Sequence, residues 1–406
     1  MIAKVNRGAF IIVVPLSILV FFASVYARIV KDPVDYVDPN IGTIAHLLVA
    51  TAPIVQLPHG MVELAHNPSP ETRDRYLASK IASFSIRALP HYSIATIPSW
   101  IMATTGKLQV NSEMDSYFDH DFETVTPYYS AVLLEDYDIN VEYTVTEHAA
   151  YYRFTFPKSS DSHILIGSNS KVKILKDYII EGVENARSAT AYFYAEFSKP
   201  FASYGAWKNE QIFIDSKEQS GDSIGVVTNF TTSQEEQIEV KIGISYIDIK
   251  QARQNLEKEI PAWDFEGVKN QAKNIWNKAL SKIKIEGGTE KQRTIFYSAL
   301  YRVMLGSQSM NLTEYGRYYS RVDNKVHNTD GHDFYRVGSN WGSHHSLFPL
   351  FLLLEPEKQN ALMRSYVLVE EQGNWISTSG GRHNMIGHHE AATITDAYMK
   401  GFRILM

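Results

Sequence analysis

The chain has 406 residues, of which 44% are hydrophobic and 21% charged, and this length exceeds what a single hydrophobic core supports. The net charge of −6 is mild and no block of basic residues occurs, which argues against nucleic acid as a partner. Because the sequence has no cysteine, it excludes disulfides, a thiol nucleophile, a cysteine-bound metal and an acylated lipoprotein anchor.

Residues 1–27 have the pattern of a signal peptide. Lys4 and Arg7 precede an apolar run from Ala9 to Val25, and a small-residue cleavage site follows at residues 25–27. An uncleaved membrane anchor is the alternative, but Pro15 interrupts the run, which is also short for a span of about 20 residues. We therefore expect a periplasmic or secreted protein with no stable membrane anchor after cleavage.

Residues 32–250 are predicted to form an antiparallel β-sandwich. Every second residue is apolar in the clearest runs, residues 139–145 and 238–244, and shorter runs follow the same period. Clusters of Gly, Asp, Asn and Ser separate the runs. Many short strands of period two, with no helix between them, are typical of antiparallel sheets buried on one side.

The period then changes to that of a helix, which predicts a helical linker over residues 251–288. Its apolar face comprises Val268, Ala272, Ile275, Trp276, Ala279, Leu280 and Ile283. Thr289 and Gln292 form a capping box for the next helix. That helix is expected to point five side chains inward, namely Phe296, Ala299, Leu300, Val303 and Met304.

Residues 289–406 are predicted to begin an α/α toroid. A loop-rich stretch at 307–343 precedes further helices at about 343–354, at 357–371 and from His389 to the end. The last helix has an apolar face formed by Ala391, Ile394, Ala397, Tyr398, Phe402 and Leu405. Because no helix stop signal follows this face, we expect a truncated chain. We also expect the isolated protein to be inactive and poorly stable, since half of the barrel core would be exposed.

Several short motifs occur in a fixed order along the chain. They include Val-Asp-Pro-Asn-Ile-Gly-Thr at 37–43, Gln-Leu-Pro-His-Gly-Met-Val at 56–62 and Met-Ile-Gly-His-His at 385–389. The others lie at 296–301, at 347–350 with 355–357, and at 396–401. Together they resemble the motifs of glycoside hydrolase family 92, in that family's order and over nearly all of the chain after the signal peptide.

The resemblance implies an α+β multidomain protein with an N-terminal β-sandwich followed by the first part of an (α/α)6 barrel. It also implies a calcium-dependent, inverting exo-α-mannosidase that removes terminal mannose from glycans. The base carboxylates and the main Ca²⁺ ligands are expected beyond Met406, so no metal ligand is assigned within the chain.

The resemblance also shows where this chain departs from the family. Inverting hydrolysis requires one carboxyl group to protonate the leaving oxygen and a second, about 6.5–9.5 Å away, to activate water. The family's acid position corresponds to Gly381, which has no proton to donate. Arg382 and His383 beside it are candidates to face a substrate anion, or a leaving group such as phosphate that needs little acid assistance.

A second departure lies at residues 341–345. Where the family has Trp-Asp-x-x-Arg, with the acid holding sugar hydroxyls, this chain has Trp341, Gly342 and His345. Either the subsite is altered, with Trp341 stacking on a sugar ring, or it has degenerated and Trp341 is an ordinary core residue. The substrate-binding candidates are Trp341, His389, His388, Arg382, His383 and His345.

The adjacent histidine pairs 344–345 and 388–389 do not predict a zinc site, because neighbouring residues on a helix point about 100° apart. His389 aligns with the family's pocket histidine and is expected to bind substrate, whereas His344 is expected to be structural. His46 is a candidate for the domain interface.

Further carboxylates and a polar loop lie close to these candidates. Glu390 begins a helix, where a negative charge is favourable, and catalysis is its alternative role. Glu371 is another nearby carboxylate. The polar stretch 330–336 is either a ligand-binding loop or solvated surface.

Two classes of function therefore remain open. The first is an α-mannosidase of altered specificity. The second is a non-catalytic mannoside-binding relative or an inactive truncated fragment. Gly381 and Gly342 favour the second class, while Trp341, His389 and the motif order favour the first.

Overall fold

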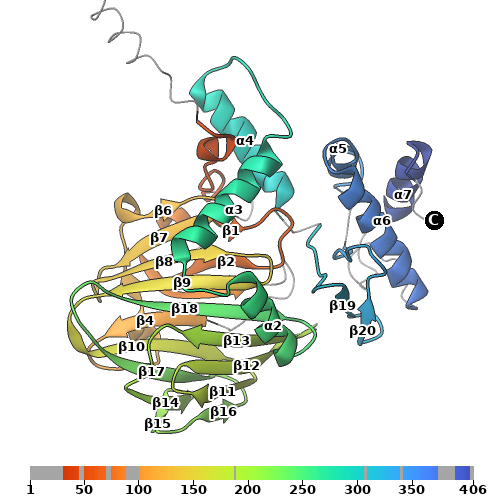
Figure 1. Cartoon of the computed structure of the whole chain (residues 1–406). Helices are drawn as coiled ribbons and strands as arrows, with labels where there is room; N and C mark the ends of the chain where they lie inside the picture. Colours follow the sequence, from red (N-terminus) through yellow and green to blue (C-terminus); the bar gives the residue numbers. More distant parts are fainter. Residues whose placement is uncertain are drawn as a thin grey trace, which may run out of the picture.

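The computed structural model describes residues 31–44, 50–69, 75–87, 100–186, 189–305, 309–338, 342–373 and 389–402. The expected signal peptide lies outside these ranges. Two β-sheets form a sandwich, and helices follow it along the chain (Figure 1). The predicted α+β organisation, an antiparallel β-sandwich followed by a helical domain, is confirmed.

The first sheet has nine strands in the order β1-β2-β3-β4-β10-β17-β14-β15, with β5 paired to β3. All of its pairs are antiparallel. Its strands are β1 (Val55–Gln56), β2 (Glu63–Ser69), β3 (Lys80–Arg87), β4 (Trp100–Thr105), β5 (Ser116–Tyr117), β10 (Ser159–Ser168), β14 (Ser203–Lys208), β15 (Gln211–Ile214) and β17 (Ile224–Thr232).

The second sheet, also antiparallel, has the order β16-β11-β12-β13-β18-β9-β8-β7-β6. Its strands are β6 (Thr124–Val125), β7 (Tyr129–Leu134), β8 (Ile139–Val145), β9 (Ala149–Phe156), β11 (Lys171–Lys176), β12 (Ile179–Ala186), β13 (Ala189–Phe197), β16 (Glu218–Ser220) and β18 (Glu236–Ser245). Four short 3₁₀ helices, η1 (Pro33–Tyr36), η2 (Arg75–Leu77), η3 (Ser112–Met114) and η4 (His120–Phe122), lie around the sandwich in the described ranges.

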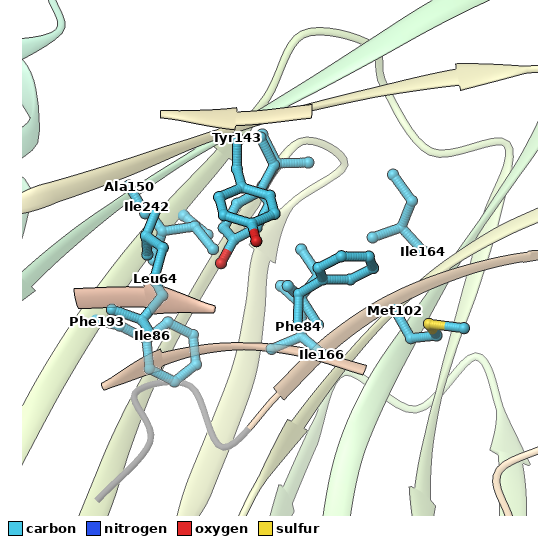
Figure 2. Packing of buried hydrophobic residues seen from close by; sticks show 14 of the residues in the cluster. Leu64, Phe84, Ile86, Met102, Tyr143, Ala150, Ile164, Ile166, Phe193 and Ile242 are labelled. Atoms are coloured by element: carbon cyan, nitrogen blue, oxygen red, sulfur yellow. The ribbon is translucent and has the colours of Figure 1, made fainter. Parts of the chain in front are cut away.

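The core of the sandwich lies between the inner faces of the two sheets. Figure 2 shows Leu64, Phe84 and Ile166 of the first sheet together with Tyr143 and Ile242 of the second. The apolar members of the predicted alternating runs are buried, as the period of two requires.

The outer face of the second sheet is more covered than the alternation predicts. Glu142, Thr144 and Lys241 are buried because α2 (Ile249–Glu259) packs on β18 and α3 (Phe265–Leu280) packs on β8. Gly243 permits this approach, because a Cβ there would lie 2.2 Å from the carbonyl oxygen of Ala252 in α2. The predicted linker is therefore also a cover for the sheet.

Helix α4 (Glu290–Met304) begins at the predicted capping box, in which Thr289 N donates to Gln292 Oε1 over 2.8 Å. Two predicted inward positions are wrong, because Ile275 of α3 and Ala299 of α4 are exposed. Tyr297 and Tyr301 are buried instead. Their hydroxyls donate to carbonyl oxygens, of Ile283 over 3.2 Å and of Ile54 over 2.6 Å, so these polar atoms are satisfied inside.

The remaining elements form a separate group in Figure 1. A hairpin of β19 (Arg317–Ser320) and β20 (Lys325–Asn328) is followed by α5 (Leu347–Leu354), α6 (Pro356–Glu371) and α7 (His389–Met399). The expected apolar face of α7 is partly wrong: Ala391 and Tyr398 are exposed, whereas Glu390, Thr393 and Ala397 are buried. Within the described ranges, no helix combines the length and apolar character needed to cross a bilayer.

Candidate functional site

Three histidines gather beside the start of α7. The rings of His344 and His389 stack with centroids 4.2 Å apart, and the ring of His345 lies edge-on to His344 at 4.9 Å. His345 is exposed, and the other two are half-buried. We call these three residues the histidine cluster. The structure thus brings together two predicted substrate residues, His345 and His389, with His344, which was expected to be structural.

The other predicted binding residues, Trp341, Arg382, His383 and His388, lie outside the described residues, as do Gly381 and His46. Their predicted roles therefore stay predictions. Gly342, the position of the absent family acid, is described and exposed. No heavy atom of the described residues lies within 4 Å of a Cβ at this position, so these residues leave room for a side chain there.

Two carboxylates were predicted near the site, and their environments differ. Glu371 is exposed at the end of α6, whereas Glu390, in the first turn of α7, is only 2% exposed. Neither carboxylate oxygen of Glu390 has a hydrogen-bond partner among the described residues. The burial of this carboxylate was not foreseen from its place at a helix start.

The polar stretch 330–336 separates into exposed and buried parts. Asp330, His332 and Asp333 are exposed, whereas Tyr335 is buried. The side-chain nitrogen of Asn311 lies 3.3 Å from a carboxylate oxygen of Asp333 and 3.3 Å from one of Glu147, in the β8–β9 turn. This stretch therefore contacts the sandwich.

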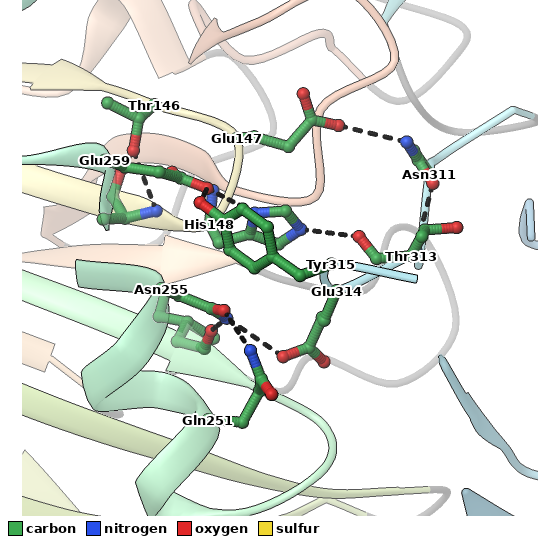
Figure 3. A network of polar contacts seen from close by, with 12 residues as sticks. Thr146, Glu147, His148, Gln251, Asn255, Glu259, Asn311, Thr313, Glu314 and Tyr315 are labelled. Carbon is green, nitrogen blue, oxygen red and sulfur yellow. Dashed lines mark hydrogen bonds and ion pairs between the residues drawn. The ribbon is translucent and has the colours of Figure 1, made fainter. Parts of the chain in front are cut away.

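The junction between the sandwich and the helical domain is a polar network, drawn in Figure 3. His148 Nδ1 donates to Glu259 Oε1 over 2.6 Å, and Nε2 donates to the carbonyl oxygen of Thr313 over 2.8 Å. Since both ring nitrogens face acceptors, the imidazole is held in its charged form. Burial alone lowers the pKa of His148, but the hydrogen bond with Glu259 and the charges of Glu259, Glu147 and Glu314 outweigh it and raise the pKa to about 9.

Glu314 occupies the next position in the same network and is fully buried. It accepts hydrogen bonds from the backbone N–H of Tyr246 over 2.9 Å and from Asn255 Nδ2 over 3.0 Å. Burial raises the pKa of this carboxyl, while the charge of His148 opposes the rise. The network connects the β8–β9 turn, the end of β18, α2 and the loop after α4, and so joins the sandwich to the helical domain.

The raised pKa of His148 predicts a pH dependence of stability. The stabilisation is fully present below the unfolded-state pKa of about 6.5 and is lost as the pH rises through about 9. It amounts to at most about 3 kcal/mol. Urea unfolding between pH 6 and pH 10 should therefore show the wild-type protein losing stability relative to His148→Gln as the pH rises from about 6.5 to about 9, with little further relative loss above that. Parallel curves for the two proteins would contradict this assignment.

A second buried contact links the sandwich to α5 and α6. His59 Nε2 lies 2.8 Å from Glu355 Oε2, and its Nδ1 lies 2.6 Å from the hydroxyl of Ser309. Lys282 Nζ donates to the other carboxylate oxygen over 2.7 Å. Burial lowers the pKa of His59, so its ring is neutral. Burial would raise the pKa of Glu355, but contacts with His59, Lys358 and Lys282 outweigh this effect and hold that pKa well below its usual range. A neutral ring therefore faces a charged carboxylate.

Two protein-family models together match most of the chain. The model of the glycosyl hydrolase family 92 N-terminal domain matches residues 36–245, and the model of the family's catalytic domain matches residues 251–405. The chain belongs to glycosyl hydrolase family 92.

Solved family 92 structures share the fold. A family GH92 alpha-mannosidase of Bacteroides thetaiotaomicron, in complex with mannoimidazole, is 22% identical with a TM-score of 0.83, covering 93% of this chain and 54% of that one. A GH92 inverting mannosidase of Bacteroides thetaiotaomicron VPI-5482 is 25% identical with a TM-score of 0.82, covering 94% of this chain and 54% of its own. The chain therefore spans just over half the length of these structures.

A curated relative covers a smaller part of the chain. An uncharacterized secreted glycosidase of Arthroderma benhamiae is 28% identical over 225 residues, which are 45% of this chain and 28% of the relative.

The described residues do not fit the calcium ion that family 92 resemblance implies. Among them, no group of three or more His, Asp or Glu side chains is arranged to hold a metal ion. The histidine cluster supplies ring nitrogens, whereas calcium is bound by oxygen ligands.

The family 92 motifs did not indicate the junction residues His148, Glu259 and Glu314, whereas Glu355 begins the motif at 355–357. A signal was also present for His59. It stands inside the motif at 56–62, and its positive φ of 59° is unusual for a residue of this size.

Proposed function

We propose that this family 92 member recognises terminal α-linked mannose and removes it from glycans by inverting hydrolysis. The observation that supports the proposal most is the gathering of His345 and His389 within the segment that matches the catalytic domain. Imidazole N–H groups and ring nitrogens suit sugar hydroxyls, which both donate and accept hydrogen bonds. We also propose export of the protein and calcium dependence, with ligands that the described residues do not supply.

Mannose release tests the hydrolase directly. The purified protein is incubated with α-linked mannobioses and p-nitrophenyl α-mannoside, and ¹H NMR follows the free mannose and its first-formed anomer. Release of the β-anomer, abolished by EDTA, would support the hydrolase and overturn the expectation that the isolated protein is inactive. Binding of mannosides without any turnover would instead favour the alternative, a non-catalytic mannoside-binding relative or an inactive fragment. Absence of both binding and turnover would contradict the hydrolase and the mannoside-binding relative, and would agree only with an inactive fragment.

A second candidate function is the cleavage of phosphomannosyl substrates, in which phosphate is the leaving group. Gly381 offers no acid, and a phosphate departs with little need of protonation, whereas a sugar hydroxyl requires a proton from an acid. The histidine cluster provides three imidazoles whose N–H groups suit phosphate oxygens. Phosphomannosyl substrates should then have a higher kcat/KM than plain mannosides, and equal values would contradict this candidate.

A further inference from the structure

Four large side chains stand in solvent at one end of the β-sandwich. We call them the aromatic patch, and they are Tyr76, Leu77, Tyr117 and Phe122, with exposed fractions of 40%, 65%, 49% and 67%. A single exposed apolar residue is ordinary on a protein surface. A group of them on adjoining segments instead marks a place where something binds.

The segments that carry the aromatic patch are held together by contacts among the described residues. His120 Nε2 of η4 lies 2.7 Å from the carbonyl oxygen of Tyr76 in η2. Tyr117 of β5 pairs with Lys80 of β3, whose Nζ lies 4.2 Å from the centre of the tyrosine ring. The loop between η2 and β3 and the loop between β5 and η4 therefore lie against each other and form one surface.

Tyr76 is exposed and yet fixed in position. Its ring stacks on that of His120, with centroids 4.2 Å apart and an angle of 12° between the planes. The imidazole is itself fixed, because its Nδ1 lies 2.6 Å from Oε2 of the buried Glu123 side chain and its ring meets Phe118 edge-on at 4.8 Å. A ring that is already ordered loses little conformational entropy when a ligand packs on it.

The aromatic patch lies at the end of the sandwich opposite the junction with the helical domain. The backbone N–H of Tyr117 donates to Asp136 Oδ2 over 2.9 Å, and Asp136 precedes β8, whereas His148 of the junction follows it. The seven residues of β8, at about 3.3 Å each, separate these two ends by roughly 20 Å. A ligand on the patch therefore does not occupy the junction.

Size and charge limit what the aromatic patch can bind. Four half-exposed side chains of this size offer on the order of 400 Å². A stable protein–protein contact buries about 800 Å² on each partner, so a second folded protein is a poor fit. Asp119 and Asp121 are exposed beside Phe122, and their charge disfavours an anionic ligand or an anionic membrane surface.

A neutral sugar chain has the chemistry that remains. A pyranose presents an apolar C–H face that packs on an aromatic ring, and hydroxyl groups at its edge that donate to carboxylates. The aromatic patch offers rings to the face, and Asp119 and Asp121 offer acceptors to the edge.

We propose that the aromatic patch is a second, non-catalytic binding surface for the interior of a mannose-containing glycan chain. This inference rests on the proposed recognition of mannosides by the helical domain. A polymeric glycan held on the sandwich keeps its free ends at a raised local concentration near the same protein molecule, which strengthens the binding of long chains over short ones.

Affinity electrophoresis in gels that contain a soluble α-mannan tests this surface. Tyr76→Ala/Phe122→Ala should raise the Kd for the mannan at least about 10-fold, because it removes two aromatic contacts. Tyr178→Ala is the matched control. Tyr178 is also 40% exposed and has a lysine over its ring, Lys176 at 5.7 Å, but it lies in the β11–β12 turn, and its loss should leave the Kd unchanged.

An NMR titration of the wild-type protein gives a readout that does not depend on how a variant folds. Linear α-mannotetraose should shift the ring signals of His120, on which Tyr76 stacks. The binding of methyl α-mannoside at the histidine cluster should be the same in the wild-type protein and in the double variant.

Wild-type affinity for mannan in a folded double variant, or unshifted His120 signals, would overturn the glycan surface and leave recognition at the histidine cluster intact. Self-association of the wild-type protein that the double variant abolishes would assign the aromatic patch to a second copy of the chain and overturn it as well. Failure to bind either mannan or methyl α-mannoside would overturn the proposed function together with the glycan surface.

Discussion

Replacing Trp276 with alanine is expected to lower the free energy of unfolding by about 3–5 kcal/mol. The indole of Trp276 is fully buried where α3, α4 and the start of the first sheet meet, with its ring centroid 5.1 Å from that of Tyr301. Its Nε1 donates to the carbonyl oxygen of Gln56 over 2.7 Å. Alanine leaves a cavity and also removes the donor from a buried acceptor. Urea denaturation at pH 7 measures the change.

Two substitutions serve as controls for this prediction. Trp276→Phe retains most of the ring and should lose only about 1–2 kcal/mol, chiefly through the hydrogen bond. Trp263 is 42% exposed and contacts Lys241, whose Nζ lies 4.1 Å from its ring, so Trp263→Ala should lose about 1 kcal/mol. Equal losses for Trp276→Ala and Trp263→Ala would contradict the role of Trp276 in packing α3 and α4 against the start of the first sheet.

Replacing Glu355 with alanine is expected to cost about 1–3 kcal/mol, because it removes the carboxylate that faces the buried, neutral ring of His59. Lys282 and Lys358 are partly exposed and regain water, but His59 is buried and loses its acceptor. The lowered pKa of Glu355 sets the sign of the pH dependence. The stabilisation is present above the ordinary carboxyl pKa of about 4.5 and is lost as the pH falls toward the folded-state value.

The matched variant Glu355→Gln keeps the shape of the side chain and should cost less than alanine at pH 7. Its difference from the wild-type protein should shrink between pH 5 and pH 3. In a double-mutant cycle, His59→Phe and Glu355→Gln should show a coupling above about 0.5 kcal/mol, because the two side chains are in contact. Additive losses, or a Glu355→Gln difference that grows in acid, would contradict the charged carboxylate.

The alternation of apolar and polar residues along the strands was enough to predict the sandwich and most of its core. A strand with period two directs Val141 and Ile242 inward whatever lies on the other face, and both are fully buried. The outer face could not be predicted in the same way. Glu142 and Lys241 are buried because α2 and α3 return to cover the second sheet, which is a tertiary contact that the strand sequences do not encode.

Helix faces were predicted less well where polar residues point inward. In α4, Tyr297 and Tyr301 are buried because their hydroxyls reach carbonyl oxygens far along the chain, whereas Ala299, chosen for its apolarity, is exposed. In α7, Glu390 replaces Ala391 on the buried face. A hydrophobic period alone does not anticipate these positions, because the choice depends on partners in other elements.

The candidate site was predicted in part. The family motifs singled out His345 and His389, and the structure places both in one cluster. The motifs did not reveal that His344 and His389 stack on each other, since 45 residues of sequence separate them, from 344 to 389. Contacts between distant segments, such as His148 with Glu259, likewise carry no local signal.

The most direct test of mannoside recognition at the histidine cluster is an NMR titration of the histidine side chains with methyl α-mannoside. The ring signals of His344, His345 and His389 should shift with a common saturation curve. The ring of His163, which lines a depression of about 320 Å³ on the sandwich, should not shift. Shifts confined to His163 or to other sandwich histidines, with the cluster unaffected, would contradict the assignment of the site to the helical domain.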